Sequence, residues 1–407
     1  MFINFTVGNF RSFKDKAKFS VEKRGQTKEL PENCFGSSAL PSKMSLLKSA
    51  VIYGANASGK SNLIQALTAM QSIVLHNGIG DRDVALLLEP FSLSEESVRE
   101  PVFFELEMVA NGRRYRYGFE CTRDEIVSEW LYAQKQRMTL MFAREHNDFV
   151  DSSPEFAELK AWAKVLSDTK LNLPKNALFL STAARMFAGG ACEAVLNWFE
   201  KTLQIVSAHT YQQYLGNTFA AMADDGLAES ISRLISKADL GIQKVEKAEQ
   251  EASGSGKGQA RIGTIHVIGN MSYQFDLFHH ESAGTQKVFA LSASLLDVLK
   301  NGKVLFIDEL DASLHPLLVG QLIEMFHSGN TSNAQMVATT HSPTILTETT
   351  LRRDQVWFVG KDSASSSTLV SLADFTGIRG NFTRIMKDYL HGCFGGVPNI
   401  KNLKVEG

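Results

Sequence analysis

Runs of apolar residues near the two ends of the chain predict a parallel core sheet covered by helices. Residues 51–53 form a short apolar run of strand type, and apolar residues recur at helical spacing from 63 to 74. Residues 304–307 and 335–338 form two more runs of strand length, and the pattern at 288–299 is that of a helix. Short buried strands that alternate with helices are typical of an α/β fold.

A second group of strands is expected after the first helix. Asn111-Gly112 is a strong hairpin signal between two of these strands. The stretches that alternate or run apolar are 102–109, 113–121, 126–134 and 138–143. They predict an antiparallel sheet beside the parallel core.

The centre of the chain reads mainly as helix. Amphipathic patterns predict helices at 155–166, 191–203 and 227–235. Residues 251–258 read as a flexible loop, and 261–268 and 271–278 as a hairpin across a Gly-Asn turn. Sustained heptads are lacking between 154 and 251, so a compact helical lid is expected in place of a coiled coil. Near the C-terminal end we expect strands at 355–359 and 368–372 and a helix at 384–390.

The glycine-rich segment after the first apolar run fits the pattern G-x-x-x-x-G-K-[ST]. Its backbone N–H groups and the following helix N-terminus suit phosphate oxygens. Lys60 is expected to bridge the β- and γ-phosphates, and the Ser61 hydroxyl to bind Mg²⁺. The alternative is a Gly/Ser turn before an ordinary helix. The nucleotide-binding residues predicted here are Gly54, Asn56, Ser58, Gly59, Lys60 and Ser61.

Two acids end the apolar run at 304–307. Asp308 is placed to hold Mg²⁺ through its water shell, as the second acid of a phosphate-loop ATPase does. Glu309 follows it directly and is the natural general base for the attacking water. The alternative is that these acids only cap the strand or the next helix.

With these motifs in order, the chain resembles the ABC-type ATPases of the SMC and RecF kind. Within them it looks most like the prokaryotic AAA-family ATP/GTP-binding proteins of the RloA and AbiL type, which are associated with phage defence. The resemblance covers about 1–120 and 261–407. It implies a phosphate-loop NTPase of ABC-ATPase type: a mixed core sheet, an antiparallel β subdomain and an inserted helical lid. The expected divisions are 1–150, 151–260 and 261–407.

The resemblance also implies roles for residues that the chain pattern alone does not assign. Ser282 and Gly284 stand where the family has its signature motif, which reaches the γ-phosphate bound by a partner subunit. Asp311 matches the loop that contacts the opposite subunit, and His341 matches the histidine that contacts the γ-phosphate. A lone histidine is more often structural, but residues 339–342 follow an apolar strand as the family requires. Arg11 lies near the nucleotide or is a surface arginine.

The family's glutamine loop has no assigned position in this sequence. Gln71 lies in the first helix and is too early, and Gln134 lies in a predicted strand. Residues 88–91 occupy the expected place and contain no glutamine.

Composition indicates which cofactors, location and partners to expect. Four cysteines are scattered without a C-x-x-C pair, which gives no sign of a zinc site or a disulfide framework. No stretch of about 18 apolar residues and no targeting pattern is seen, so no membrane contact and a cytoplasmic location are expected. The net charge of −2 gives no overall attraction to nucleic acid. Residues 113–117 alternate arginine with tyrosine and could bind nucleic acid, or form a solvated sheet face.

The function expected from the sequence is an ATP hydrolase that uses Mg²⁺. Its heads are expected to associate on ATP binding, forming a homo-oligomer. It would then regulate a separately encoded effector, a nuclease or toxin, in prokaryotic anti-phage defence. Two alternatives stay open: a RecF-like DNA-binding repair ATPase and a non-hydrolysing, nucleotide-gated scaffold.

Overall fold

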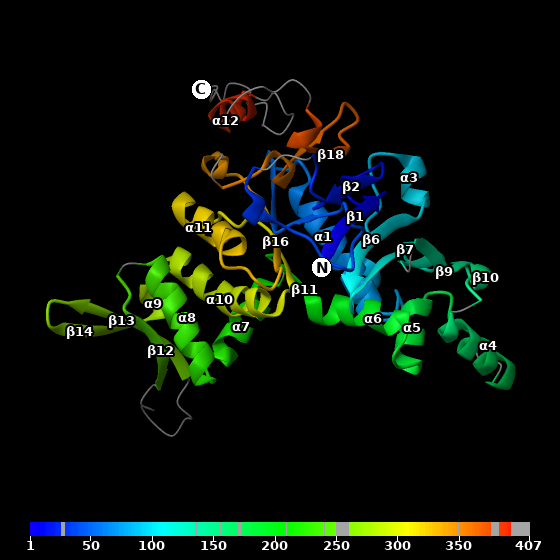
Figure 1. Ribbon diagram of the computed structural model, residues 1–407, viewed down its shortest axis with the longest axis horizontal. Helices are drawn as coiled ribbons and strands as arrows, with labels where there is room; N and C mark the ends of the chain where they lie inside the picture. Colours follow the sequence, from blue (N-terminus) through cyan, green and yellow to red (C-terminus); the bar gives the residue numbers. More distant parts are fainter. Residues whose placement is uncertain are drawn as a thin grey trace, which may run out of the picture.

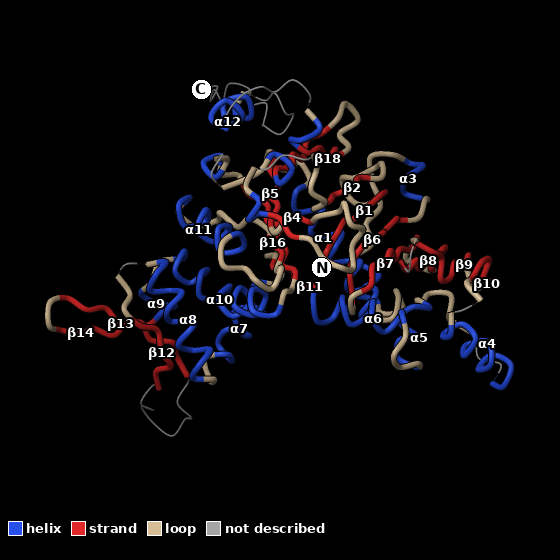
Figure 2. Tube along the Cα trace, viewed as in Figure 1, coloured by secondary structure: helices blue, strands red, loops and turns tan. Residues whose placement is uncertain are grey.

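A six-stranded sheet forms the centre of the protein (Figures 1 and 2). The structure is a computed structural model, and it describes residues 1–25, 29–134, 137–154, 156–169, 172–208, 210–239, 241–249, 260–347, 350–375 and 382–391. The predicted loop at 251–258 lies outside these residues. The strands lie in the order β11 (Leu203–Val206), β15 (Val304–Ile307), β16 (Gln335–Thr340), β5 (Ser49–Gly54), β17 (Val356–Lys361) and β18 (Ser367–Ser371).

The first five strands of this sheet are parallel, and β18 is antiparallel to β17. Alternate residues of each strand enter two different hydrophobic cores. Ala50 and Ile52 belong to one core, whereas Val51 and Tyr53 belong to the other. Burial on both sides explains why these strands read as continuous apolar runs in the sequence. The predicted parallel core is confirmed.

A seven-stranded antiparallel sheet packs on the first core. Asn111 and Gly112 both have positive φ values, 48° and 71°, as a two-residue hairpin turn requires. The four predicted strands are confirmed, and three that were not predicted complete the sheet. Its order is β10 (Asp148–Ser152), β9 (Met138–Glu145), β8 (Ile126–Gln134), β7 (Arg113–Cys121), β6 (Val102–Ala110), β1 (Phe2–Gly8) and β2 (Ala17–Ser20).

The expected compact helical lid is not confirmed, because a core strand divides the insert. The helix predicted at 191–203 ends in a π-helical turn at Trp198–Thr202, and Leu203 begins β11. This strand pairs in parallel with β15, and its residues are shared between the two cores. Strand pairing therefore overrides the local helical pattern at this point.

The two parts of the insert lie on opposite sides of the central sheet (Figures 1 and 2). On the side of the antiparallel sheet lie α4 (Ala157–Thr169), α5 (Phe179–Met186) and α6 (Ala191–Asn197). On the other side, α7 (Tyr211–Ala221) and α8 (Asp225–Ala238) pack against α10 (Ala283–Asn301). The second part therefore supports the helix that carries the predicted signature residues.

A three-stranded sheet extends from α8 at the edge of the molecule (Figure 1). It consists of β12 (Lys244–Glu249), β13 (Ala260–Ile268) and β14 (Met271–Asp276), and β13–β14 is the predicted hairpin. Phe278 was expected in this hairpin but lies in the short helix α9 (Leu277–His280), because Asp276 accepts hydrogen bonds from Phe278 N and His279 N and caps that helix.

The remaining helices complete the second core and the phosphate-loop unit. They are α1 (Lys60–Leu75), α2 (Arg82–Leu86), α3 (Glu95–Arg99), α11 (Pro316–His327) and α12 (Phe382–Leu390). The predicted strands and helix near the C-terminal end are confirmed as β17, β18 and α12. Across the described part of the chain, no helix combines the length and apolar character that a membrane crossing needs.

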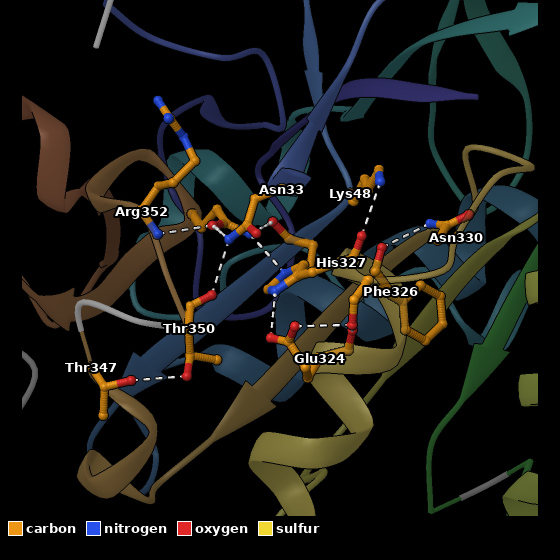
Figure 3. Close-up of polar contacts among 12 residues, drawn as sticks. Asn33, Lys48, Glu324, Phe326, His327, Asn330, Thr347, Thr350 and Arg352 are labelled. Carbon is orange, nitrogen blue, oxygen red and sulfur yellow. Dashed lines mark hydrogen bonds and ion pairs between the residues drawn. The ribbon is translucent and has the colours of Figure 1, made fainter. Parts of the chain in front are cut away.

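A buried polar network fixes the beginning of β5, the strand that leads to the phosphate loop (Figure 3). His327, at the end of α11, has its Nε2 2.8 Å from Ser49 Oγ, and Lys48 donates to the His327 carbonyl at 3.1 Å. Gln355 donates to both the carbonyl and the hydroxyl of Ser49, and Asn33 donates to Gln355 Oε1 at 2.7 Å. Burial lowers the pKa of His327. The network ties three distant segments to one strand.

Candidate functional site

The predicted site residues gather at one edge of the central sheet. The carboxyl ends of parallel strands meet at the same edge, which is where open α/β sheets bind ligands. The phosphate loop follows β5, Asp308 and Glu309 follow β15, and His341 follows β16. Ser61, Asp308 and Glu309 line one cavity of about 410 Å³. The structure thus brings residues from the two ends of the chain together at one cavity.

Two glycines shape the phosphate loop. A Cβ on Gly54 would lie 2.5 Å from both Ser58 Oγ and the Val359 carbonyl. Gly59 has φ +117° and caps α1 where the side chains of Ser12 and Ser367 approach its Cα. Neither position can hold a side chain without moving its neighbours, so the loop needs glycine at both.

Lys60 folds back over this loop. Its Nζ donates to the carbonyls of Gly54 at 2.7 Å and Ala55 at 3.0 Å. Burial lowers the pKa of Lys60, while the nearby carboxylates of Asp308 and Glu309 act in the opposite direction. The ammonium group thus lies between the loop and the two acids, where a phosphate would need a positive charge.

Thr339 joins the two acids and was not among the predicted site residues. Its hydroxyl donates to Asp308 Oδ1 at 2.6 Å and accepts from Glu309 N–H at 2.7 Å. The side chain is fully buried at the end of β16. A polar β-branched residue at the end of an apolar strand, next to a strand ending in two acids, is the sequence signal that could have found it.

Glu309 adopts an unusual backbone conformation. Its φ is +50°, in the left-handed region that residues with a Cβ rarely occupy. The side chain is exposed at the cavity, and the Leu310 N–H donates to the Thr339 carbonyl at 3.0 Å. Strained backbone of this kind persists only where neighbouring contacts hold it, and it is common at functional sites.

Asp311 and His341 are in direct contact. The His341 N–H donates to Asp311 Oδ2 at 2.9 Å, while Asp311 Oδ1 is buried without a hydrogen-bond partner among the described residues. The His341 side chain is exposed, and partial burial followed by the proximity of Lys60 lowers its pKa. This shift favours the neutral imidazole, which can donate one hydrogen bond and accept one.

The predicted signature residues begin α10. Ser282 is the exposed N-cap, and its Oγ accepts from Thr285 N–H at 3.1 Å. Thr285 Oγ1 in turn donates to Asp239 Oδ2 at 2.8 Å, which joins the end of α8 to this turn. A Cβ on Gly284 would lie 2.6 Å from the Ser313 carbonyl. The Ser282 hydroxyl is exposed and lies 2.9 Å from Thr285 Oγ1, and the first-turn N–H groups of α10 have no carbonyl partner within the helix itself.

Gln65 is a second residue that the sequence analysis missed. It lies one helical turn after Ser61 and lines the same cavity as the two acids. Its Oε1 accepts from Arg11, whose other nitrogen pairs with Glu89 at 2.7 Å. Gln71 instead donates to the carbonyls of Phe199 and Leu203 and so fastens α1 to β11.

Arg114 and Arg116 lie on one sheet face and are matched there by acidic residues. Arg114 pairs with Glu107 at 2.6 Å, and Arg116 lies over the ring of Tyr132 at 4.2 Å. Tyr115 and Tyr117 point to the other face and are buried. The alternation expected from the sequence is confirmed, and it favours the solvated sheet face over a nucleic-acid surface.

The chemistry of the donor set fits Mg²⁺. Ser61 and Asp308 offer a hydroxyl and a carboxylate to the same cavity, and Mg²⁺ prefers a few protein oxygens completed by water and phosphate. Within the described ranges, no group of three or more His, Cys, Asp and Glu side chains is arranged to hold a metal ion. The protein therefore offers a partial shell suited to a nucleotide-bound cation.

Comparison with protein families identifies the chain. The family described as "AAA domain, putative AbiEii toxin, Type IV TA system" matches residues 49–347. The match begins at β5 and includes the phosphate loop, both acids, Thr339 and His341. The chain belongs to this family. The resemblance to the RloA and AbiL type stays a prediction.

Among solved structures, heads of SMC proteins are similar to this chain. An SMC head bound to the C-terminal winged-helix domain of ScpA has 12% identity and a TM-score of 0.49, covering 91% of this chain and 97% of that one. The Thermotoga maritima SMC head has 15% identity and a TM-score of 0.41, covering 91% and 98%. A Pyrococcus furiosus Smc head bound to the C-terminal domain of ScpA has 12% identity and a TM-score of 0.43, covering 96% and 98%. No curated protein matches the sequence.

Proposed function

We propose that this AbiEii-type AAA protein is an Mg²⁺-dependent ATP hydrolase whose heads associate on ATP binding. The observation that carries the proposal is the arrangement Asp308–Thr339–Glu309 facing Ser61 across one cavity. A phosphate loop alone would support only nucleotide binding. A strand-end acid joined to a second, exposed acid supplies the parts that hydrolysis needs.

The chain's own residues divide the reaction between them. Backbone N–H groups of the loop and the Lys60 ammonium bind the phosphates. Ser61 and Asp308 would hold Mg²⁺, which when bound would neutralise charge on the phosphate oxygens. Glu309 accepts a proton from the attacking water. The water oxygen then bonds to the γ-phosphorus, and the bond between that phosphorus and the ADP oxygen breaks. Asp311 holds the backbone of His341 beside the γ-phosphate position.

A second copy of the chain completes the site in this proposal. Ser282 is exposed at the head of α10, where its hydroxyl and nearby N–H groups suit a γ-phosphate bound by the partner. ATP then acts between two heads, and hydrolysis releases them. The family description supports a role in toxin–antitoxin or phage-defence systems, in which the heads regulate a separately encoded effector such as a nuclease or toxin. The cytoplasmic location and the resemblance to the RloA and AbiL type belong to the same proposal.

The Glu309→Gln variant tests the hydrolysis chemistry. Loss of the general base should lower kcat by about 100-fold or more while the Kd for ATP stays within about threefold. An ATP-bound head pair should then accumulate, as measured by light scattering after gel filtration with ATP and Mg²⁺. The exposed Glu229→Gln variant on α8 is the matched control.

If Glu309→Gln hydrolyses ATP at the wild-type rate, the assignment of the general base is wrong. If neither the wild-type protein nor Glu309→Gln hydrolyses ATP, but both bind it and associate, the protein is a nucleotide-gated scaffold. DNA-stimulated hydrolysis that is lost on neutralising Arg114 and Arg116 would instead support a RecF-like repair ATPase.

A further inference from the structure

The head of α10 is fastened to the turn that carries Glu309. Lys287 Nζ donates to the Glu309 carbonyl at 2.6 Å and to the Ala312 carbonyl at 3.0 Å. Hydrogen bonds from a charged donor are stronger than those from a neutral one. Lys287 also lines the cavity that contains Ser61 and Asp308. One side chain therefore spans from the predicted signature helix to the predicted general base of the same chain.

A second contact joins the same two segments. Gly284 approaches the Ser313 carbonyl so closely that a Cβ would lie only 2.6 Å from that oxygen. Ser313 has φ +63° and Glu309 has φ +50°, so the turn begins and ends in left-handed backbone. Such backbone needs contacts that hold it in place. Thr339 holds this turn from the β16 side, and Lys287 and Gly284 hold it from the α10 side.

We propose that Lys287 is a positioning residue that fixes the backbone of the 309–313 turn and couples it to the head of α10. It acts through the main-chain carbonyls, so the Glu309 carboxylate stays free to face the cavity. Ser282 begins the same helix as Lys287. A change in the turn after Glu309 in one copy is therefore transmitted to Ser282, the residue that would contact the nucleotide of the other copy. The catalytic part of this inference rests on the proposed function.

Lysine suits this position for physical reasons. Its ammonium group has three donors on a flexible stem and reaches two carbonyls of one turn. An arginine at this position can donate to the same two carbonyls, although its guanidinium is wider than an ammonium group. A methionine fills a volume similar to that of lysine but has no hydrogen-bond donor. Lys287→Met therefore removes the bonds, and Lys287→Arg should restore part of their effect.

Enzyme kinetics measure the catalytic consequence. In Lys287→Met, kcat should fall about 10- to 100-fold because a small displacement of a catalytic group has effects of this size. The Kd for ATP should change by less than about threefold, since the phosphate loop is untouched. Lys287→Arg should recover at least half of the loss on a logarithmic scale. Lys300→Met is the matched control, because Lys300 is exposed at the other end of α10.

Amide hydrogen exchange tests the structural part independently of hydrolysis. Ala312 N–H donates to the Glu309 carbonyl and Leu314 N–H to the Asp311 carbonyl, so both amides report on the turn. Their exchange should quicken about tenfold in Lys287→Met and stay unchanged in Lys300→Met. An inactive wild-type protein would refute the proposed function while this measurement still tests the contact. Unchanged exchange in Lys287→Met, or an unchanged kcat in an active enzyme, would overturn the inference.

Discussion

Thr339 shows how one buried hydroxyl can organise two acidic residues. Its hydroxyl donates to Asp308 and accepts from the backbone N–H of Glu309. One side chain therefore holds both acids, one through its donor and the other through its acceptor. Valine has nearly the same shape and neither hydrogen-bonding capacity. Replacing Thr339 by valine therefore tests the hydrogen bonds of this side chain separately from its packing.

In Thr339→Val, the Glu309 N–H and one Asp308 oxygen lose their partner. We expect kcat to fall about tenfold or more, and the free energy of unfolding to fall by about 1–3 kcal/mol. Steady-state hydrolysis and calorimetric melting measure the two effects. Thr218→Val is the control, because Thr218 is also buried and its hydroxyl bonds to Ala290 and Ala293 on α10, away from the acids. A similar loss of kcat in both variants would show that Thr339 has no special role at the acids.

At the scale of an element, the start of α5 depends on a residue from the neighbouring sheet. The Leu178 side chain provides no cap, and the first helix N–H groups of Phe179 and Leu180 donate to Glu129 at 2.8 and 2.9 Å. Glu129 is fully buried on β8 and also accepts from Arg144 at 2.7 Å. The carboxylate thus satisfies the helix end that α5 cannot satisfy with its own residues.

Glu129→Ala removes the ion-pair partner of the buried Arg144 and the acceptor of two helix N–H groups. The free energy of unfolding should fall by about 3–5 kcal/mol, as expected for breaking a buried ion pair by removing one member. Thermal melting of the purified protein checks this. The exposed Glu229→Ala variant, which breaks the surface pair with Arg233, should melt at the wild-type temperature. Equal melting temperatures for both variants would contradict the assigned role of Glu129.

Most elements with a regular apolar pattern were predicted from the sequence, whereas the strands β1, β2, β10 and β11 were not. The strands at 102–110 and 113–121 have alternating residues and a strong turn between them, which specify a hairpin locally. Residues 203–206 continue the apolar spacing of the preceding helix. They become a strand only because β15 offers a parallel edge, about 100 positions later in the chain.

On the scale of the whole molecule, the exposed head of α10 is expected to face a second copy. Ser282→Arg should abolish ATP-dependent head association and lower hydrolysis to the level of an isolated head, because a bulky charged side chain blocks the shared site. Light scattering with and without ATP measures the association. Ser328→Arg, at another exposed helix end, is the control for the added charge.

Loss of the helix cap is a separate effect of replacing Ser282. Ser282→Ala also removes the cap, at a cost of about 1 kcal/mol, but adds no bulk. It should keep ATP-dependent association at a lower melting temperature. Intact association and hydrolysis in Ser282→Arg would show that the site is complete within one chain.

The sequence by itself determined the parts whose chemistry is local. A glycine-rich loop needs its glycines because the backbone must approach phosphate, and the two acids follow directly from an apolar strand, so these motifs are visible without a structure. Only the tertiary structure decided which other residues hold the loop and the two acids in place. Thr339, Gln65 and Lys287 reach the site from separate elements, and their roles depend on distances that no local pattern encodes. Strand pairing likewise placed β11 in the core, since a sheet edge is created by distant residues.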